Sequence, residues 1–364
     1  MYRALQLASL GEGYTSPNPV VGAVVLDPTG KLVGEGFHSH AGGPHAEVIA
    51  LKQAGKGANG GTLVVSLEPC CHQGRTPPCT EAVIDSGITR VVVALNDPDP
   101  RVAGGGVTHL RQAGLEVITG VMEVEAAFQN RAFIHRCSTG RPWGVLKWAM
   151  SLDGRTALSN GKSKWISCKE SRRWVHSLRS SCDALIVGGG TVRTDNPLLT
   201  TRGRRNPEPL RVVLSRSLDL PLKANLWDTQ VAKTIVASGK NINETRSTDL
   251  PDQVEVVCLD ASEPMALMDS LAKRGCNKVL WECGPSLASL AIDQGCVQEV
   301  AVFIAPKLMG GVPARTPLAE LGFSSMDQLL EIQKLSVKGV GTDLLIKGYL
   351  NSTANSSQLV EKGD

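Results

Sequence analysis

The sequence predicts an α/β protein with two domains. Its length of 364 residues suits about two domains, at roughly 150 residues for each. Short apolar runs alternate with helical patterns in both halves of the chain, which is typical of strands covered by helices. At residues 138–144 the segment STGRPWG separates a helical stretch from a new strand by glycine and proline. These observations place the domains at residues 1–141 and 142–350, with a polar tail at residues 351–364.

The first domain is predicted to be a three-layer α/β sandwich. An N-terminal helix precedes strands at VVGAVVL and KLVGEGF, and a second helix covers HAEVIALKQAG. Then come the strand TLVVSLE, the helix CTEAVIDSG, the strand TRVVVALND, and one further helix and strand. This alternation places the strands in one layer, between two layers of helices.

The second domain repeats the alternation. It opens with VLKWAMSLDGRTA and continues through SKWIS to DALIVGGGTVRTDNPLLTTR. Strands are predicted at LRVVL, KTIVAS, VEVVCL and NKVLWECG, with helices between several of them, and DLLIKGYL is the last strand. We therefore expect a second α/β domain.

The composition excludes several classes of protein. Hydrophobic residues make up 42% and charged residues 20% of the chain, as in ordinary globular proteins. A net charge of +3 and an aromatic content of 4% give no basis for binding nucleic acid. No apolar run approaches the roughly 20 residues that cross a bilayer. Because a secretory signal is also missing, the ten cysteines are predicted to be reduced and the protein cytoplasmic.

Three residues are arranged as ligands of a catalytic zinc ion. His45, Cys70 and Cys79 supply one imidazole and two thiolates, and three protein ligands leave the fourth position of zinc to water. Zinc lowers the pKa of that water to about 7, and the released proton needs an acceptor. Glu47, two residues after His45, matches the non-ligand glutamate of zinc deaminases. Residues two apart diverge in a regular helix, so we place both at an irregular first turn.

A structural zinc site, or no metal at all, is the alternative. A structural site has four protein ligands as a rule, and Cys71 or His72 could supply the fourth. That alternative leaves Glu47 without a role.

The segments SPNPVVGAVV and SLEPCCHQGRTPPC together resemble the deaminase domain of the RibD family of bifunctional riboflavin-biosynthesis enzymes. The resemblance implies a cytidine-deaminase-like α/β/α fold for the first domain. It also implies a set of residues that bind the pyrimidine substrate and its phosphate: Asn18, His38, Arg75 and Asp97.

The glycine-rich segment VGGGTV follows an apolar strand and could approach a phosphate group. On its own it is weak evidence, because it does not fit GxGxxG and could be a turn without a ligand. However, KWAMSLDGRTA, SKW, TVRTDNPLLTTR and WECGPSLASL resemble the reductase domain of the same family. This resemblance implies a dihydrofolate-reductase-like fold, NADPH as cofactor and a phosphoribosyl substrate.

The resemblance also implies residue roles in the second domain. Lys147 and Asp195 would lie near the reacting sugar carbon, and Arg179 with Arg202 could bind a ribose phosphate in bidentate fashion. The implied substrate residues are Ser163, Arg179, Leu199, Arg202 and Glu282. The implied cofactor residues are Ala149, Trp165, Thr191, Asp195, Gly284, Pro285, Ser286, Leu287, Ala288, Ser289 and Leu290. Gly284 begins a helix whose first N–H groups suit a pyrophosphate.

The sequence therefore predicts a bifunctional enzyme of riboflavin biosynthesis, a zinc-dependent deaminase joined to an NADPH-dependent reductase. Its expected partners are a small phosphoribosyl pyrimidine and further copies of the chain, as a dimer or tetramer. Two alternatives stay open at this point. One is a nucleoside or tRNA deaminase with an unrelated second domain, and the other is a non-catalytic regulator that binds NADPH or flavin.

Overall fold

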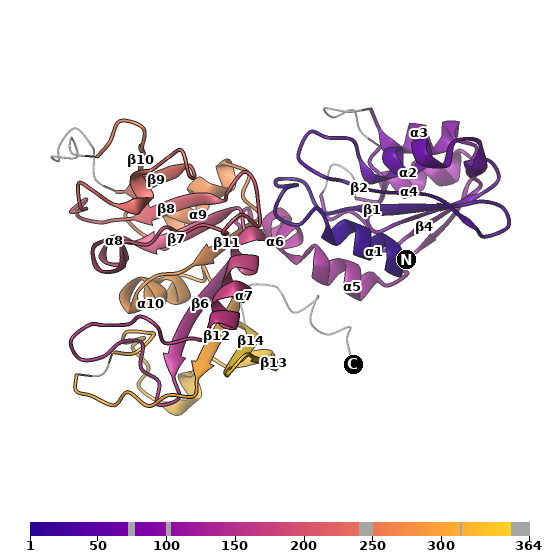
Figure 1. Ribbon diagram of the computed structural model, residues 1–364. Helices are drawn as coiled ribbons and strands as arrows, with labels where there is room; N and C mark the ends of the chain where they lie inside the picture. Colours follow the sequence, from indigo (N-terminus) through magenta and orange to yellow (C-terminus); the bar gives the residue numbers. More distant parts are fainter. Residues whose placement is uncertain (72–76, 100–102, 240–249, 314, 351–364) are drawn as a thin grey trace. The chain divides into compact units, whose positions relative to one another are not determined.

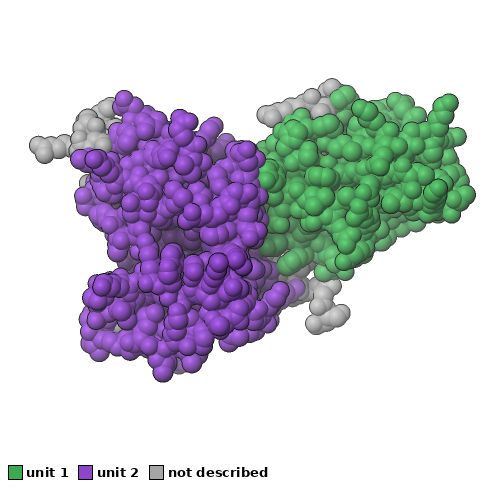
Figure 2. Space-filling view, in the orientation of Figure 1, with its two compact units in different colours: residues 1–140, 357–364 green, residues 141–356 purple. Residues whose placement is uncertain are grey.

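The computed structural model describes residues 1–350, except for 72–76, 100–102, 240–249 and 314 (Figure 1). Two compact units divide the chain, one of residues 1–140 and one that begins at Arg141 (Figure 2). Each unit contains its own β-sheet. The tail at residues 351–364 lies outside the described residues. No helix in the described part of the chain is long and apolar enough to cross a membrane.

The first unit has a five-stranded sheet with the order β2-β1-β3-β4-β5. Strand β1 is antiparallel to both neighbours, whereas β3, β4 and β5 are parallel. The strands are β1 (Gly22–Leu26), β2 (Leu32–Phe37), β3 (Thr62–Val65), β4 (Arg90–Val93) and β5 (Glu116–Thr119). The helices are α1 (Tyr2–Ser9), α2 (Ala46–Ala54), η1 (Gly55–Ala58), α3 (Cys79–Asp85), α4 (Gly105–Gln112), α5 (Glu123–Gln129) and α6 (Arg131–Thr139).

Helices cover both faces of this sheet, because alternate strand residues face opposite ways. Val25 and Val65 pack with α2, α3 and α4 in one core. Val24 and Val64 pack against Leu7 of α1 on the other face. Figure 1 shows α2, α3 and α4 on one side of the sheet and α1 with α5 on the other. The predicted three-layer α/β arrangement is confirmed.

One edge of the sheet collects the predicted deaminase residues. The carboxyl ends of β2, β3 and β4 lie at this edge, together with the amino end of the antiparallel β1. His38 follows β2, Cys70 follows β3 and Asp97 follows β4, while Asn18 precedes β1. The first turns of α2 and α3 bring the remaining residues of the cluster. Topology alone therefore gathers residues from distant parts of the sequence.

The second unit has a nine-stranded sheet with the order β10-β9-β8-β7-β11-β6-β12-β14-β13. The strands from β10 to β12 are parallel, and β14 and β13 extend the sheet in antiparallel fashion. The strands are β6 (Trp143–Ser151), β7 (Ala184–Gly188), β8 (Leu210–Leu214), β9 (Thr234–Ser238), β10 (Glu255–Cys258), β11 (Lys278–Trp281), β12 (Glu299–Ala305), β13 (Ile332–Val340) and β14 (Asp343–Leu350). Strands β12 and β13 are additional to those predicted from the sequence.

Two cores hold the helices of the second unit on its sheet. One core includes Leu267 of α9 and Ala291 of α10, and the other includes Val175 of α7 and Val192 of α8. The helices are α7 (Lys169–Ser180), α8 (Gly189–Asp195), η2 (Asn225–Trp227), α9 (Pro264–Lys273), α10 (Pro285–Asp293) and η5 (Met326–Gln328). The carboxyl ends of β7, β8 and β11 lead into α8, a loop and α10, and such edges bind ligands in α/β sheets.

Arg211 is a buried arginine that holds several loops of the second unit in place. Arg211 on β8 is fully buried. Its guanidinium donates to Thr234 Oγ1 and to the main-chain oxygens of Leu198, Asn225, Leu226, Asp228 and Ala232. These carbonyl oxygens accept the hydrogen bonds of the buried guanidinium, so that no carboxylate is needed beside it. The bond to the Leu198 oxygen also holds the segment before Leu199 on the sheet.

Candidate active sites

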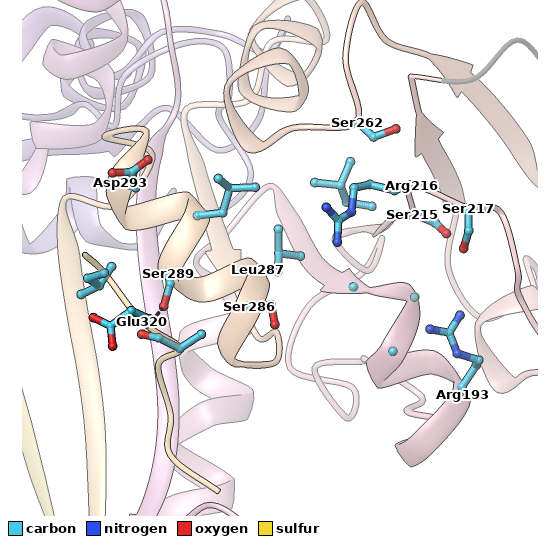
Figure 3. A pocket seen from close by; sticks show the side chains of 17 residues that line it. Arg193, Ser215, Arg216, Ser217, Ser262, Ser286, Leu287, Ser289, Asp293 and Glu320 are labelled. Atoms are coloured by element: carbon cyan, nitrogen blue, oxygen red, sulfur yellow. Dashed lines mark hydrogen bonds between the residues drawn. The ribbon is translucent and has the colours of Figure 1, made fainter.

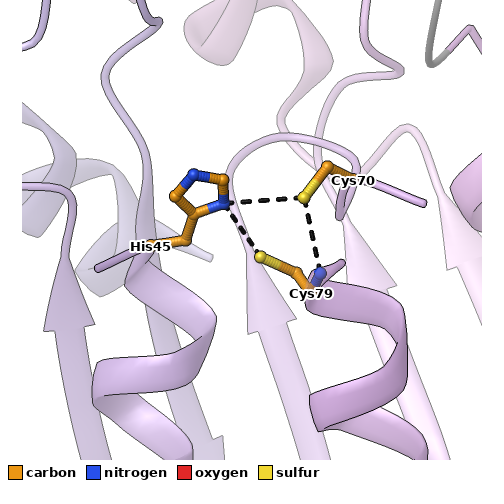
Figure 4. A group of neighbouring side chains, drawn as sticks. All are labelled: His45, Cys70 and Cys79. Atoms are coloured by element: carbon orange, nitrogen blue, oxygen red, sulfur yellow. Dashed lines mark hydrogen bonds between the residues drawn. The ribbon is translucent and has the colours of Figure 1, made fainter. Parts of the chain in front are cut away.

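The three predicted zinc ligands converge in the first unit (Figure 4). His45 Nδ1 lies 2.9 Å from Cys79 Sγ and 3.6 Å from Cys70 Sγ. All three ligand atoms lie within 4.8 Å of one another. Zinc bonds of about 2.0–2.3 Å would place such ligand atoms about 3–4 Å apart in a tetrahedral site. The cluster therefore fits one zinc ion bound by one nitrogen and two sulfurs.

A fourth protein ligand does not join this group within the described residues. Cys71 is described and is not part of the cluster, and His72 lies outside the described residues. Three ligands and an open position are the arrangement of a catalytic zinc site rather than a structural one.

Hydrogen bonds among the three ligands shift the pKa values of their side chains. A hydrogen bond from the Cys79 thiol, and another from His45, lower the pKa of Cys70 well below that of a free thiol. The hydrogen bond to Cys70 raises the pKa of the His45 imidazole. The backbone N–H of Cys79, in the first turn of α3, also points at Cys70 Sγ at 3.4 Å. These contacts favour the thiolate of Cys70, the form of cysteine that binds zinc. The hydrogen bond to Cys70, together with burial, raises the pKa of the Cys79 thiol.

Glu47 lies in the first turn of α2, and His45 is the N-cap of that helix with an extended backbone. The expected irregular first turn is therefore confirmed. Only 3% of Glu47 is exposed, and burial raises the pKa of its carboxyl group. A carboxylate in this position can accept a proton and return it, since its charged form is not strongly favoured by solvent.

Asn18 and His38 form a hydrogen-bonded pair beside the zinc ligands. His38 Nδ1 is 3.0 Å from the main-chain oxygen of Pro44, and its Nε2 is 3.1 Å from Asn18 Nδ2. The carbonyl can only accept, so His38 carries its proton on Nδ1 and Nε2 accepts from the amide. Burial lowers the pKa of His38, in agreement with a neutral ring. The His38 and His45 rings also meet edge to face, with centroids 5.4 Å apart.

Glu68 is a residue that the sequence reasoning missed. Its buried carboxylate accepts backbone N–H groups from Asp97, Gly104 and Val107, at 3.1, 2.9 and 2.9 Å. It thereby fixes the loop that carries Asp97, whose pKa is raised to about 6 by burial. A Cβ on Gly106 would lie 2.0 Å from the Pro69 oxygen, so α4 packs closely behind Cys70. The only sequence signal for the role of Glu68 is its place in the segment SLEP, directly before Cys70.

Arg75, the fourth substrate residue predicted for the deaminase, lies outside the described residues. The other three, Asn18, His38 and Asp97, lie at the same sheet edge as the zinc ligands.

A charged triad occupies the centre of the second unit. Arg179 of α7 donates from Nε and Nη2 to the two oxygens of Glu282, at 2.5 and 3.0 Å. Lys147 Nζ on β6 lies 3.9 Å from Glu282 Oε2. The nearby Arg179 and Lys147 cations lower the pKa of Glu282 despite its burial, whereas burial lowers the pKa of Lys147. Lys147 and Glu282, predicted for the reductase site, are therefore close together.

Arg179 has partners of its own within the second unit. Its planar fork is directed at Glu282, and Nη1 donates to the Thr200 oxygen at 2.9 Å. One N–H of Nη1 and one of Nη2 remain, so a substrate role for Arg179 stays a prediction, with the Nε edge of its fork taken by the Glu282 carboxylate. Arg202 is exposed and has a φ of 57°.

The remaining predicted residues of the second unit are spread around this centre. The Leu199 side chain is buried in the core, so only its backbone is open to a substrate. Ala149 also packs against that core. Ser163 is half-buried, and the neighbouring Lys164 donates to the Asp195 main-chain oxygen at 3.0 Å. Trp165 is 66% exposed, and the Arg172 guanidinium lies 4.5 Å from its ring centre.

A cavity of about 610 Å³ lies at the carboxyl edge of the second sheet (Figure 3). Its walls are the start of α8, the loop after β8, one side of α10 and residues 319–321. Of the predicted cofactor residues, four line it, namely Ser286, Leu287, Ser289 and Leu290. Seven others do not, namely Ala149, Trp165, Thr191, Asp195, Gly284, Pro285 and Ala288. The cavity also contains Arg193, Ser215, Arg216 and Ser217, which the sequence reasoning did not select.

Comparisons with known proteins identify the family of each unit. Residues 1–95 match the cytidine and deoxycytidylate deaminase zinc-binding region, and residues 142–346 match the RibD C-terminal domain. The riboflavin biosynthesis protein RibD of Synechocystis sp. is 50% identical over 98% of this chain and 97% of its own length. The chain belongs to the RibD family.

Solved structures of this family have the same fold. Acinetobacter baumannii RibD is 39% identical, with a TM-score of 0.86 over 96% of this chain and 98% of its own. A deaminase/reductase from Thermotoga maritima is 36% identical, with a TM-score of 0.86 over 96% and 97%. This member of the family is accordingly a bifunctional deaminase and reductase of riboflavin biosynthesis that uses zinc and NADPH. The alternative with an unrelated second domain and the non-catalytic alternative are not favoured.

Proposed function

We propose that the first domain removes the amino group at C2 of 2,5-diamino-6-(5-phosphoribosylamino)pyrimidin-4(3H)-one. The second domain then reduces the ribosyl group of the product to give 5-amino-6-(5-phosphoribitylamino)uracil. The observation that carries this proposal is the three-ligand cluster with the buried Glu47, on one chain with a reductase domain. The Thermotoga relative is described by both activities, a diaminohydroxyphosphoribosylaminopyrimidine deaminase and a 5-amino-6-(5-phosphoribosylamino)uracil reductase.

In the deaminase site, His45, Cys70 and Cys79 would hold the zinc ion. A bound zinc ion would lower the pKa of a water molecule to about 7, so that this water can lose a proton at neutral pH. As the water oxygen bonds to C2, Glu47 takes one proton from it and delivers this proton to the pyrimidine ring nitrogen. Glu47 then carries the second proton, from the new C2 hydroxyl, to the amino group, and the C2–N bond breaks to release ammonia. The burial of Glu47 supports this role, since it keeps both protonation states accessible.

The pyrimidine and its phosphate would be held by the remaining residues of the sheet edge. Asn18 and His38 are fixed to each other and to the Pro44 carbonyl, so they can orient a ring without first reorganising. Asp97 is positioned by Glu68 from behind. Arg75 is proposed for the phosphate.

In the reductase site, NADPH supplies the hydride when it is bound. The first turn of α10, from Gly284, would offer N–H groups to its pyrophosphate, and the side chains of α10 already line the cavity. The wider cofactor set of Ala149, Trp165, Thr191 and Asp195 remains a proposal.

We assign the proton transfer at the sugar to Lys147 rather than Asp195. Reduction at C1′ leaves the ring oxygen in need of a proton, and Lys147 can donate one from Nζ. Burial lowers its pKa, which makes the ammonium a better acid. Glu282, held by Arg179, keeps the cation in place at 3.9 Å. Ser163, Leu199 and Arg202 would hold the phosphoribosyl group, with Arg202 as the exposed cation for the phosphate.

A two-step assay tests the function. The purified full chain is incubated with the diamino substrate, and ammonia release and NADPH absorbance are followed together. We expect equal amounts of ammonia released and NADPH consumed, with ammonia appearing first. Ammonia release without NADPH oxidation would limit the function to the first domain. NADPH oxidation without ammonia release would contradict the proposed order.

Assembly into dimers or tetramers and a cytoplasmic location stay predictions. The edge strand β13 exposes Leu335 and Val337, at 59% and 56%. Exposed apolar residues on a sheet edge support association with another chain. Light scattering on the full chain measures the oligomeric state directly.

A further inference from the structure

Two loops of the second unit meet where the parallel strands β6 and β12 end. Ser151 and Ala305 are the last paired residues of these strands, so the loops that follow start side by side. The backbone N–H of Leu152 donates to the main-chain oxygen of Lys307 at 2.8 Å. The two loops are therefore joined directly at the carboxyl edge of the sheet, where β7, β8 and β11 also end.

Lys307 crosses from one loop to the other with its side chain. Its Nζ donates to the main-chain oxygens of Trp165 and Ile166, at 3.0 and 2.7 Å. These carbonyl groups lie between β6 and α7, outside any helix or strand. A charged donor makes a stronger hydrogen bond than a neutral one. Among the residues that the structure describes, Lys307 forms no ion pair, so the two carbonyl oxygens are the partners of its charge.

Asp153 holds the backbone from which the Lys307 side chain extends. The Ser151 hydroxyl donates to its carboxylate at 2.5 Å, and the backbone N–H groups of Met309 and Gly310 donate to it at 3.1 and 2.7 Å. These hydrogen bonds lower the pKa of Asp153 to about 2, so the carboxylate keeps its charge and its donors at neutral pH. The backbone around Lys307 is therefore fixed to the loop after β6.

The segment at residues 163–166 is also tied to residues beside the proposed reductase site. Lys164 donates from Nζ to the main-chain oxygen of Asp195, at the end of α8, at 3.0 Å. The guanidinium of Arg172, on α7, lies 4.5 Å from the ring centre of Trp165. The indole ring is nevertheless 66% exposed. Hydrogen bonds thus fix the backbone of this segment, while the Trp165 side chain stays accessible to a ligand.

We infer that Lys307 is a positioning residue of the reductase reaction. Its ammonium group holds residues 163–166 in the conformation in which Ser163 meets the phosphoribosyl group and Trp165 meets NADPH. This inference rests on the roles proposed above for these two residues. A segment that is fixed in advance loses less freedom when a ligand binds, which strengthens binding. Lys307 acts through backbone carbonyl groups, so it is not itself a catalytic residue.

The test compares Lys307→Met and Lys307→Arg with wild type in the full chain. Methionine keeps much of the side-chain length but cannot donate, whereas arginine keeps a charged donor. We expect Lys307→Met to raise the KM for NADPH and for 5-amino-6-(5-phosphoribosylamino)uracil by about tenfold, as for the loss of a charge-assisted hydrogen bond. The kcat should stay within about threefold of wild type, because Lys147 and Glu282 keep their arrangement. Lys307→Arg should return both KM values to within about threefold of wild type.

Hydrogen–deuterium exchange gives a readout that does not depend on turnover. Peptides covering residues 163–168 should exchange faster in Lys307→Met than in wild type, and at the wild-type rate in Lys307→Arg, as measured by mass spectrometry. Ammonia release by the first domain should be unchanged in both variants. Lys273→Met is the matched control, because it removes an ammonium group from the exposed end of α9. It should change none of these values.

Unchanged KM values in Lys307→Met, or unchanged exchange of residues 163–168, would overturn the inference. A fall in kcat alone would also overturn it, as would equal losses in the methionine and arginine variants, since the donor would then not matter. The exchange measurement separates this inference from the proposed function. A wild-type chain that never oxidises NADPH with the uracil compound would refute the function, while faster exchange in Lys307→Met alone would still show that Lys307 holds the segment.

Discussion

Replacing Glu47 by glutamine is expected to lower ammonia release by a factor of about 10² to 10⁴, the usual contribution of a positioned acid–base group. The amide is similar in size to the carboxyl group but cannot take a proton from the water and pass it on. Glu47 is buried beside the zinc ligands without being one of them. Zinc content should therefore stay at one ion per chain, as measured by elemental analysis of the purified variant.

Glu81→Gln is a suitable control for this variant. Glu81 lies in the first turn of α3, close in sequence to Cys79, but it is exposed and contacts His109. Its loss should leave ammonia release within about twofold of wild type, since exposed ion pairs contribute little. Loss of zinc from Glu47→Gln would mean that the carboxylate helps to bind the metal. Full activity without loss of zinc would remove Glu47 from the mechanism.

Replacing Arg179 by methionine is expected to lower the free energy of unfolding of the second unit by about 3–5 kcal/mol. The change leaves the Glu282 carboxylate buried, with Lys147 3.9 Å away and His176 as a further nearby group. The side chains of Arg179 and Glu282 are 15% and 10% exposed, so water cannot replace the lost contacts. Reductase activity should fall with it, because Lys147 and Glu282 lose their fixed arrangement. Denaturant unfolding at pH 7 measures the change.

The pH dependence provides an independent check on the Arg179 variant. In wild type the Arg179 and Lys147 cations lower the pKa of Glu282 below its ordinary 4.5, so the pair stabilises the fold above pH 4.5 and this contribution is lost on acidification. In Arg179→Met burial dominates and the carboxyl group is protonated more easily. The stability difference between the two proteins should thus begin to narrow above pH 4.5, where the variant's carboxyl group takes up its proton, and should continue to narrow below pH 4.5 until the wild-type carboxyl group is protonated as well. A difference that is constant with pH would contradict the pairing.

Arg179→Lys and Arg173→Met complete the series. Lysine keeps the charge but cannot donate two parallel hydrogen bonds, so an intermediate loss is expected. Arg173 lies on the same helix and is exposed, and its replacement should cost less than about 0.5 kcal/mol.

The zinc site was predictable from sequence because its chemistry is restrictive. Few residue types bind zinc, and His45, Cys70 and Cys79 could be selected by type and by the glutamate near the histidine. Placing them together also required only that strand ends meet at one sheet edge. The positions of His45 and Glu47 in the first turn of α2 followed from helix geometry.

Other features depend on tertiary contacts that no local pattern indicates. Arg179 and Glu282 are 103 positions apart, and only the packing of α7 near the end of β11 brings them together. Arg211 belongs to an ordinary strand pattern, yet its guanidinium donates hydrogen bonds to main-chain oxygens of several loop residues. Glu68 was missed because its partners are backbone N–H groups.

We propose that one chain carries out two separate reactions in a fixed order, and the Glu47→Gln protein tests this order most directly. NADPH oxidation by this variant is measured with the diamino substrate and, separately, with 5-amino-6-(5-phosphoribosylamino)uracil. We expect almost no oxidation with the diamino compound and a wild-type rate with the deaminated one. Rapid NADPH oxidation with the diamino compound, or none with the deaminated compound, would contradict the account.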